Sequence, residues 1–168
     1  MNDPAPIVIG IAVILAIVLV VANSNKPRHV LSHWSHFFEF FSMSSNTFYT
    51  ELEKVLVKHE MPNSTIKRPT LKEGGILSAS REYLRIKHED TIFDVCAAPF
   101  GKDFFISWWL YRLSGKESER TFYQIDEEDM FRSCVHNCIL ECIDELTKDK
   151  GTLHLTEAQK TFKMMDRK

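Results

Sequence analysis

A run of three cysteines, spaced four residues apart, is the feature of this chain that most suggests chemistry: Cys134, Cys138 and Cys142 in the stretch CVHNCILEC. Thiols at this density could bind a soft metal ion or take part in a redox reaction. Zinc sites usually use Cys-x2-Cys or histidine-containing pairs on tight turns, whereas this spacing follows a regular helix. We therefore predict a buried seam of small side chains, reduced and unliganded, along the edge of an apolar stripe.

A second group that could bind a metal consists of His29, His33 and His36, spaced i, i+4 and i+7. On a helix this spacing would gather three imidazoles on one side. No carboxylate or thiolate lies at a matching spacing, so we favour a polar helix face at a wet interface. Metal binding by these histidines stays open.

Cys96, close to Asp94 in FDVCAAPFG, is the remaining candidate nucleophile, with His59 or His88 as its possible base. The sequence around it has no papain-like or caspase-like signature. Walker A, G-x-S-x-G, H-E-x-x-H and G-x-G-x-x-G patterns are also missing from the sequence. We predict a protein that is not an enzyme and needs no cofactor; a cysteine-dependent membrane-bound enzyme is the alternative.

The compartment of these thiols depends on the N-terminal segment. From Ile7 to Ala22 no side chain is charged or hydrogen-bonding. A helix from Pro4 to Ala22 would be about 28 Å long, close to the thickness of the hydrocarbon core. A signal peptide would begin with a positive region, but Asp3 is the charged side chain here. Residues 1–22 are therefore predicted to be a transmembrane anchor.

The basic residues that follow this segment predict its orientation. Lys26 and Arg28 come after the span, and no basic side chain precedes it. The positive-inside rule then places the N-terminus outside and the C-terminal domain in the cytoplasm. A cytoplasmic domain keeps its cysteines reduced, so structural disulfides are not expected.

Length and charge limit what the rest of the chain can be. Residues 23–168 suffice for one compact domain. The whole chain has 21 Lys and Arg against 23 Asp and Glu, mixed along its length. Because no basic stripe is present, nucleic-acid binding is not expected, although a small anionic ligand is possible.

Residues 23–43 are predicted to be an aromatic juxtamembrane stem. Apolar residues recur there at the spacing of one helix face, which predicts a helix. Such a helix could lie at the lipid headgroups or pack against the domain or a neighbouring subunit. The candidate membrane or interface residues of the stem are Trp34, Phe37, Phe38 and Phe41.

Residues 44–148 are predicted to be an α+β domain, followed by a loosely held tail at 149–168. Helical periodicity before Pro62 and again from Gln124 to Leu146 predicts two helices. Between them lie segments rich in β-branched and aromatic residues, with turns at Glu89-Asp90 and FGKD. We predict a helix-strands-helix order, in which both helices pack on an antiparallel β-meander of three or four strands.

The last predicted strand, FFISWWLYRL, is apolar on both faces. One face carries Phe105, Trp109 and Tyr111, which we predict to meet a partner. Ala12 and Ala16 form a weak small-x3-small signal for packing between spans. The predicted function is a single-pass membrane subunit that binds a partner or ligand and forms a homo-oligomer or a membrane complex. A ligand-gated oligomeric channel or pore effector is the alternative.

Overall fold

The computed structural model describes residues 29–72, 80–113, 120–148 and 155–165 of the chain. The predicted anchor, including Ala12 and Ala16, lies outside the described residues. Within the described ranges, no helix combines the length and the apolar character needed to cross a membrane.

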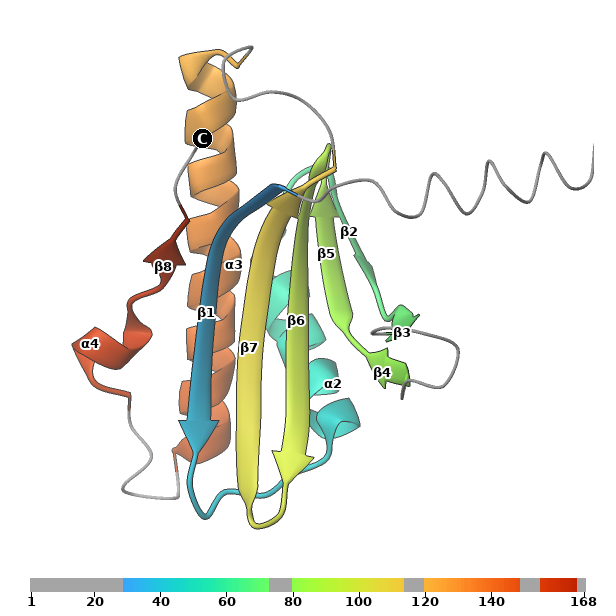
Figure 1. Ribbon diagram of the computed structural model, residues 1–168, viewed down its shortest axis with the longest axis vertical. Coiled ribbons are helices and arrows are strands. Elements are labelled where there is room, and N and C mark those ends of the chain that lie inside the picture. The colour runs from blue at the N-terminus through green and yellow to red at the C-terminus, as the bar shows by residue number, and fades with distance from the viewer. Residues whose placement is uncertain (1–28, 73–79, 114–119, 149–154, 166–168) are drawn as a thin grey trace, which may run out of the picture.

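Two helices cover one face of an antiparallel sheet, and no helix of the described residues lies over its other face (Figure 1). The strand order across the sheet is β2-β5-β6-β7-β1-β8, and β3 and β4 form a separate small sheet. The α+β class and the antiparallel sheet are confirmed. The elements are β1 His29–Phe38, α2 Ser45–Lys58, β2 Ser64–Lys67, β3 Thr70–Lys72, β4 Ser80–Glu82, β5 Leu84–His88, β6 Thr91–Phe100, β7 Asp103–Arg112, α3 Phe122–Thr147, α4 Glu157–Lys160 and β8 Lys163–Met164.

Strand β1 replaces the helix predicted for the stem, so that prediction was wrong. β1 pairs along its length with β7 and lies inside the sheet, between β7 and β8. The register shifts between Val30 and Ser32, so buried Leu31 is out of phase with Trp34 and Phe38. This irregularity hides the two-residue period of a strand and imitates helical spacing. The predicted helix-strands-helix order is therefore wrong, because β1 precedes α2. The main sheet of the described residues also has six strands, where three or four were predicted.

The predicted interface residues of the stem are mostly core residues. Trp34, Phe38 and Phe41 are each at most 3% exposed and belong to the hydrophobic core beneath the helices. Phe37 differs because alternate side chains of a strand point to opposite faces. It lies on the face of the sheet opposite α2 and α3.

Both long helices form where the sequence predicts them. Ser44 caps α2 by accepting from the backbone of Thr47, and Thr121 and Gln124 form a capping box at the start of α3. Each helix buries one apolar stripe against the sheet. The buried apolar residues of the stripes are Phe48, Leu52, Val55 and Leu56 on α2, and Phe131, Val135, Ile139 and Ile143 on α3.

Both predicted hairpin turns are confirmed. Glu89 and Asp90 connect β5 to β6, and Gly101 and Lys102 connect β6 to β7. Gly101 has a φ of 66°, in the left-handed region that a side chain disfavours. These tight turns bring β5, β6 and β7 together as the predicted meander.

Residues 155–165 of the predicted loose tail are packed on the domain. The Trp34 indole Nε1 donates to the Gln159 carbonyl at 2.6 Å, and the His136 ring bonds the Lys160 carbonyl at 2.7 Å. The Phe162 ring lies 5.6 Å from the Trp108 ring. These contacts join the tail to β1, β7 and α3.

Candidate functional site

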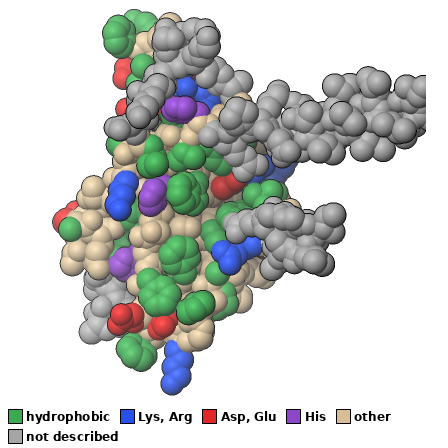
Figure 2. Space-filling model, in the orientation of Figure 1, with side chains coloured by type: hydrophobic (Ala, Val, Ile, Leu, Met, Phe, Trp, Pro, Cys, Tyr) green, Lys and Arg blue, Asp and Glu red, His purple; other side chains and the backbone are tan. Residues whose placement is uncertain are grey.

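The face of the sheet away from the helices carries a group of aromatic side chains, which we call the open face: His33, Phe37, Phe100, Phe105 and Trp109. The register places His33 beside Trp109 and Phe37 beside Phe105. Their neighbours on β7, Phe104 and Trp108, point the other way into the core. Figure 2 views this side of the molecule, and hydrophobic side chains gather at its centre over the strands.

Rings of the open face are partly exposed to solvent, and they contact one another in pairs. Phe37 is 42% exposed, Trp109 39% and Phe100 73%. The His33 and Trp109 rings stack with centroids 4.6 Å apart, and the Phe37 and Phe100 rings meet edge to face at 6.4 Å. Contiguous aromatic surface of this kind marks interaction sites, because water is readily displaced from it.

Tyr111 was also predicted to meet a partner, but it is buried in a polar network. Its hydroxyl donates to the Asp94 carboxylate at 2.6 Å. Arg85 donates to both oxygens of the same carboxylate, at 2.7 and 2.8 Å. This hydrogen bonding raises the pKa of Arg85. The network fixes β5, β6 and β7 side by side at the border of the open face.

The predicted helix would have placed His29, His33 and His36 on one side. They lie instead on strand β1, where His33 and His36 point to opposite faces of the sheet. His33 stacks on Trp109 at the open face. His36 lies on the helix side, with its ring edge-to-face against Phe38 at 4.6 Å. Burial lowers the pKa of His36.

The candidate nucleophile Cys96 is not joined to its candidate bases. Cys96 is buried in register with Ser107, and the Arg81 guanidinium lies 3.8 Å from its sulfur. His59 and His88 instead contact Glu141 and Glu127 of α3, on the helix side of the sheet. The Cys-His arrangement considered from the sequence is therefore not formed.

The predicted thiol seam divides into buried and accessible members. Cys138 and Cys142 are fully buried, whereas Cys134 is partly exposed, which differs from the prediction. Burial raises the pKa of Cys138 and of Cys142 to about 12. Both are protonated near neutral pH and are poor nucleophiles.

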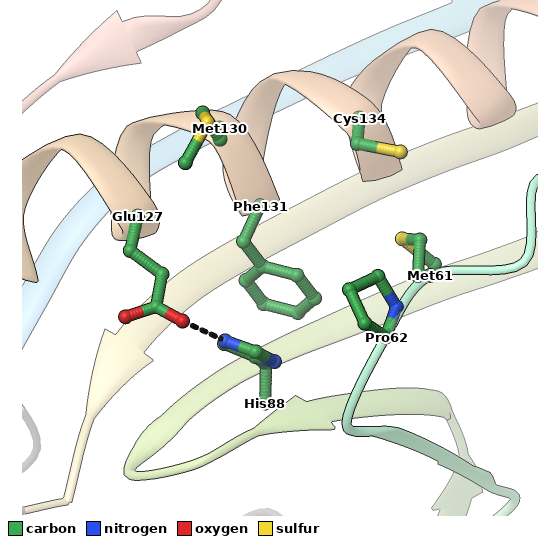
Figure 3. A pocket seen from close by; sticks show the side chains of 7 residues that line it. All are labelled: Met61, Pro62, His88, Glu127, Met130, Phe131 and Cys134. Atoms are coloured by element: carbon green, nitrogen blue, oxygen red, sulfur yellow. Dashed lines mark hydrogen bonds and ion pairs between the residues drawn. The ribbon is translucent and has the colours of Figure 1, made fainter.

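Cys134 lines a cavity of about 240 Å³ between α3, the end of β5 and the turn after α2. Figure 3 shows Glu127, Met130, Phe131 and Cys134 along α3, with Met61 and Pro62 facing them. His88 lies 3.0 Å from the Glu127 carboxylate and stacks on the Phe131 ring at 5.3 Å. The cavity is mostly apolar, with sulfur atoms from two methionines and one cysteine.

Among the residues that the structure describes, two groups of side chains could hold a metal ion, and neither was predicted. In each, three possible ligand atoms lie within 4.8 Å of one another. The groups are His59, Cys134 and Cys138, and His88, Glu89 and Glu127. In the first group, the spacing of Cys134 and Cys138 was visible in the sequence. His59 was not visible as their partner, because it follows a different helix, α2.

Comparison of the chain with protein-family models and with curated proteins finds no match.

Proposed function

We propose that the chain is a membrane-anchored, non-enzymatic assembly subunit whose cytoplasmic domain associates with a second copy through the open face. The observation that carries this proposal is the uncovered aromatic group around Phe37, Phe100 and Trp109. Sheets that pack face to face lie about 10 Å apart and interdigitate such side chains. Pairing two open faces would remove these rings from water.

The connection to the predicted anchor favours a second copy as the partner. Residues 23–28 separate the predicted span from β1, and a chain of that length reaches about 20 Å at most. β1 supplies His33 and Phe37 to the open face. Spans that pack through Ala12 and Ala16 would hold two such domains close together, which raises their effective concentration.

The end of the sheet that would face the membrane also carries exposed aromatic residues. His29 at the start of β1 is in register with Arg112, which donates to Glu128 of α3 at 2.6 Å. From Glu128 to Phe122 a helix extends about 9 Å further. Phe122 and Tyr123 are 84% and 85% exposed there. Aromatic rings are favoured at the membrane-water interface, which supports this orientation.

Mass measurement of the intact chain in detergent tests the proposal. We expect the wild-type chain to form a dimer or a larger assembly. Phe37→Ser should weaken association by about tenfold or more, as the loss of an interface aromatic does. Val57→Ser is the matched control, because Val57 is an apolar residue on α2 that is 67% exposed and outside the open face. A monomeric wild type, or equal association of both variants, would contradict the proposal.

A further inference from the structure

We propose that His59, Cys134 and Cys138 form a binding site for a thiophilic metal ion, Zn²⁺. One imidazole nitrogen and two sulfur atoms lie within 4.8 Å of one another. The two cysteines are one turn apart on α3, and His59 follows the last residue of α2. The site would therefore join the two long helices across their interface.

The spacing of the three atoms is close to that of a zinc site. With Zn–S near 2.3 Å and Zn–N near 2.0 Å, tetrahedral ligands lie about 3.5 to 3.8 Å apart. Since each separation is within 4.8 Å, reaching this geometry shortens any of them by about 1.3 Å at most. Because His59 is exposed and Cys134 partly so, rotation of their side chains can supply that shift.

A carboxylate already orients the histidine. The Nε2 atom of His59 lies 2.7 Å from one Glu141 oxygen, and Lys58 Nζ lies 2.7 Å from the other. Zinc-binding histidines usually donate their second N–H to such a carboxylate. The tautomer protonated on Nε2 leaves the lone pair of Nδ1 for a metal. Glu141 is thus a positioning residue for the site.

The balance of charge also suits a divalent ion. Cys138 is fully buried, where an isolated thiolate would be costly. Two thiolates and one Zn²⁺ have no net charge, so the buried unit is neutral. Either the Zn²⁺ ion alone or the two thiolates alone would leave a net charge of two units in this buried position, which is unfavourable.

The cavity beside Cys134 supplies a route of entry and space for a fourth ligand. Its volume of about 240 Å³ accommodates water molecules or a small ligand. Figure 3 shows the Cys134 side chain at one end of this cavity, on the side of Met61. A site with three protein ligands and one solvent-facing position is an established arrangement for zinc.

Titration of the full chain in detergent with Co²⁺, under reducing conditions, tests this inference. We expect one Co²⁺ per chain, with a thiolate-to-cobalt absorption band that Zn²⁺ abolishes. His59→Gln and Cys134→Ser should remove the band. Glu141→Gln should weaken binding by about 10- to 100-fold, as loss of an outer-shell partner does. Cys142→Ser and Cys96→Ser are matched controls, because both thiols lie outside the site.

The result that would overturn the inference is a wild-type chain without a thiolate band, or a control that loses as much affinity as Cys134→Ser. Thermal unfolding of each variant reports whether it is folded. Because His59 is exposed, we expect His59→Gln to remain folded. This variant therefore tests metal binding even if a cysteine variant unfolds. Association through the open face is measured separately, so failure of one proposal leaves the other distinguishable.

Discussion

Replacement of Glu128 by Gln should strongly destabilise the domain, because this carboxylate compensates two arginines at the end of the sheet. Arg112 Nη2 and Arg120 Nη1 each lie 2.6 Å from the same oxygen of Glu128. The side chains of Arg112 and Glu128 are 2% and 0% exposed. Removing the negative charge of Glu128 therefore leaves the buried positive charge of Arg112 without compensation.

The size of the effect follows from these contacts. A hydrogen bond to a charged group contributes about 1.5 to 3 kcal/mol, and two are affected here. Breaking a buried ion pair by removing one partner costs about 3 to 5 kcal/mol. Since a domain is stable by about 5 to 15 kcal/mol in total, Glu128→Gln should lose a large fraction of the free energy of unfolding.

Urea unfolding of the full chain in detergent, followed by tryptophan fluorescence, measures this loss. Glu127→Gln is the matched control, because its carboxylate is 45% exposed and contacts His88 at 3.0 Å. Exposed pairs contribute about 0 to 1 kcal/mol. A loss below about 1 kcal/mol for Glu128→Gln, or equal losses for the two variants, would refute the reasoning.

Three further predictions concern the thiols, pH and the orientation at the membrane. Native thiol labelling of the metal-free chain should be fast at Cys134 and slow at the buried Cys138 and Cys142; equal rates at all three would contradict the burial described. Burial lowers the pKa of His136, whose ring accepts from Trp108 Nε1 at 3.0 Å. The unfolded chain therefore binds more protons as pH falls through about 6.5, so the free energy of unfolding should decrease from pH 7 to pH 5. His136→Gln should flatten this dependence in urea titrations, and an unchanged slope would assign it to other groups. In nanodiscs, a polarity-sensitive dye on Tyr123→Cys should report an apolar environment and the same dye on Val57→Cys should not; matching spectra would oppose the proposed orientation.

Patterns within a few residues of sequence predicted the two long helices and the two hairpin turns. The stripes of α2 and α3 repeat with a helical period over several turns, and the turns at Glu89 and Gly101 are short-range features. These signals are present within a few residues of sequence. They sufficed for the class of the fold and for the β5-β6-β7 meander.

The remaining features depend on contacts between distant segments. In β1, buried Leu31, Trp34 and Phe38 have the spacing of a helix face, and only pairing with β7 makes the segment a strand. The sequence of the tail, residues 155–165, likewise has no periodicity from which its contact with Trp34 could be predicted. The candidate metal site needs His59 beside Cys134, and the packing of α2 against α3 brings them together.

The open face was predicted in part, because the sequence of β7 shows two apolar faces. Phe105 and Trp109 lie on the uncovered side as predicted. Phe100 joins them through the predicted pairing of β6 with β7. Phe37 joins them through the pairing of β1 with β7, which the sequence did not reveal. Tyr111 shares that face but is covered by its network with Arg85 and Asp94.

Cross-linking through Ser35→Cys in membranes tests the central claim most directly. Ser35 is exposed on β1, between His33 and Phe37, and is in register with Ser107. If two copies associate through the open face, a short thiol cross-linker should join chains at this position and not at Val57→Cys on α2. The wild-type chain reports the background from Cys134. Equal cross-linking at both introduced positions, or none above background at Ser35→Cys, would contradict the account.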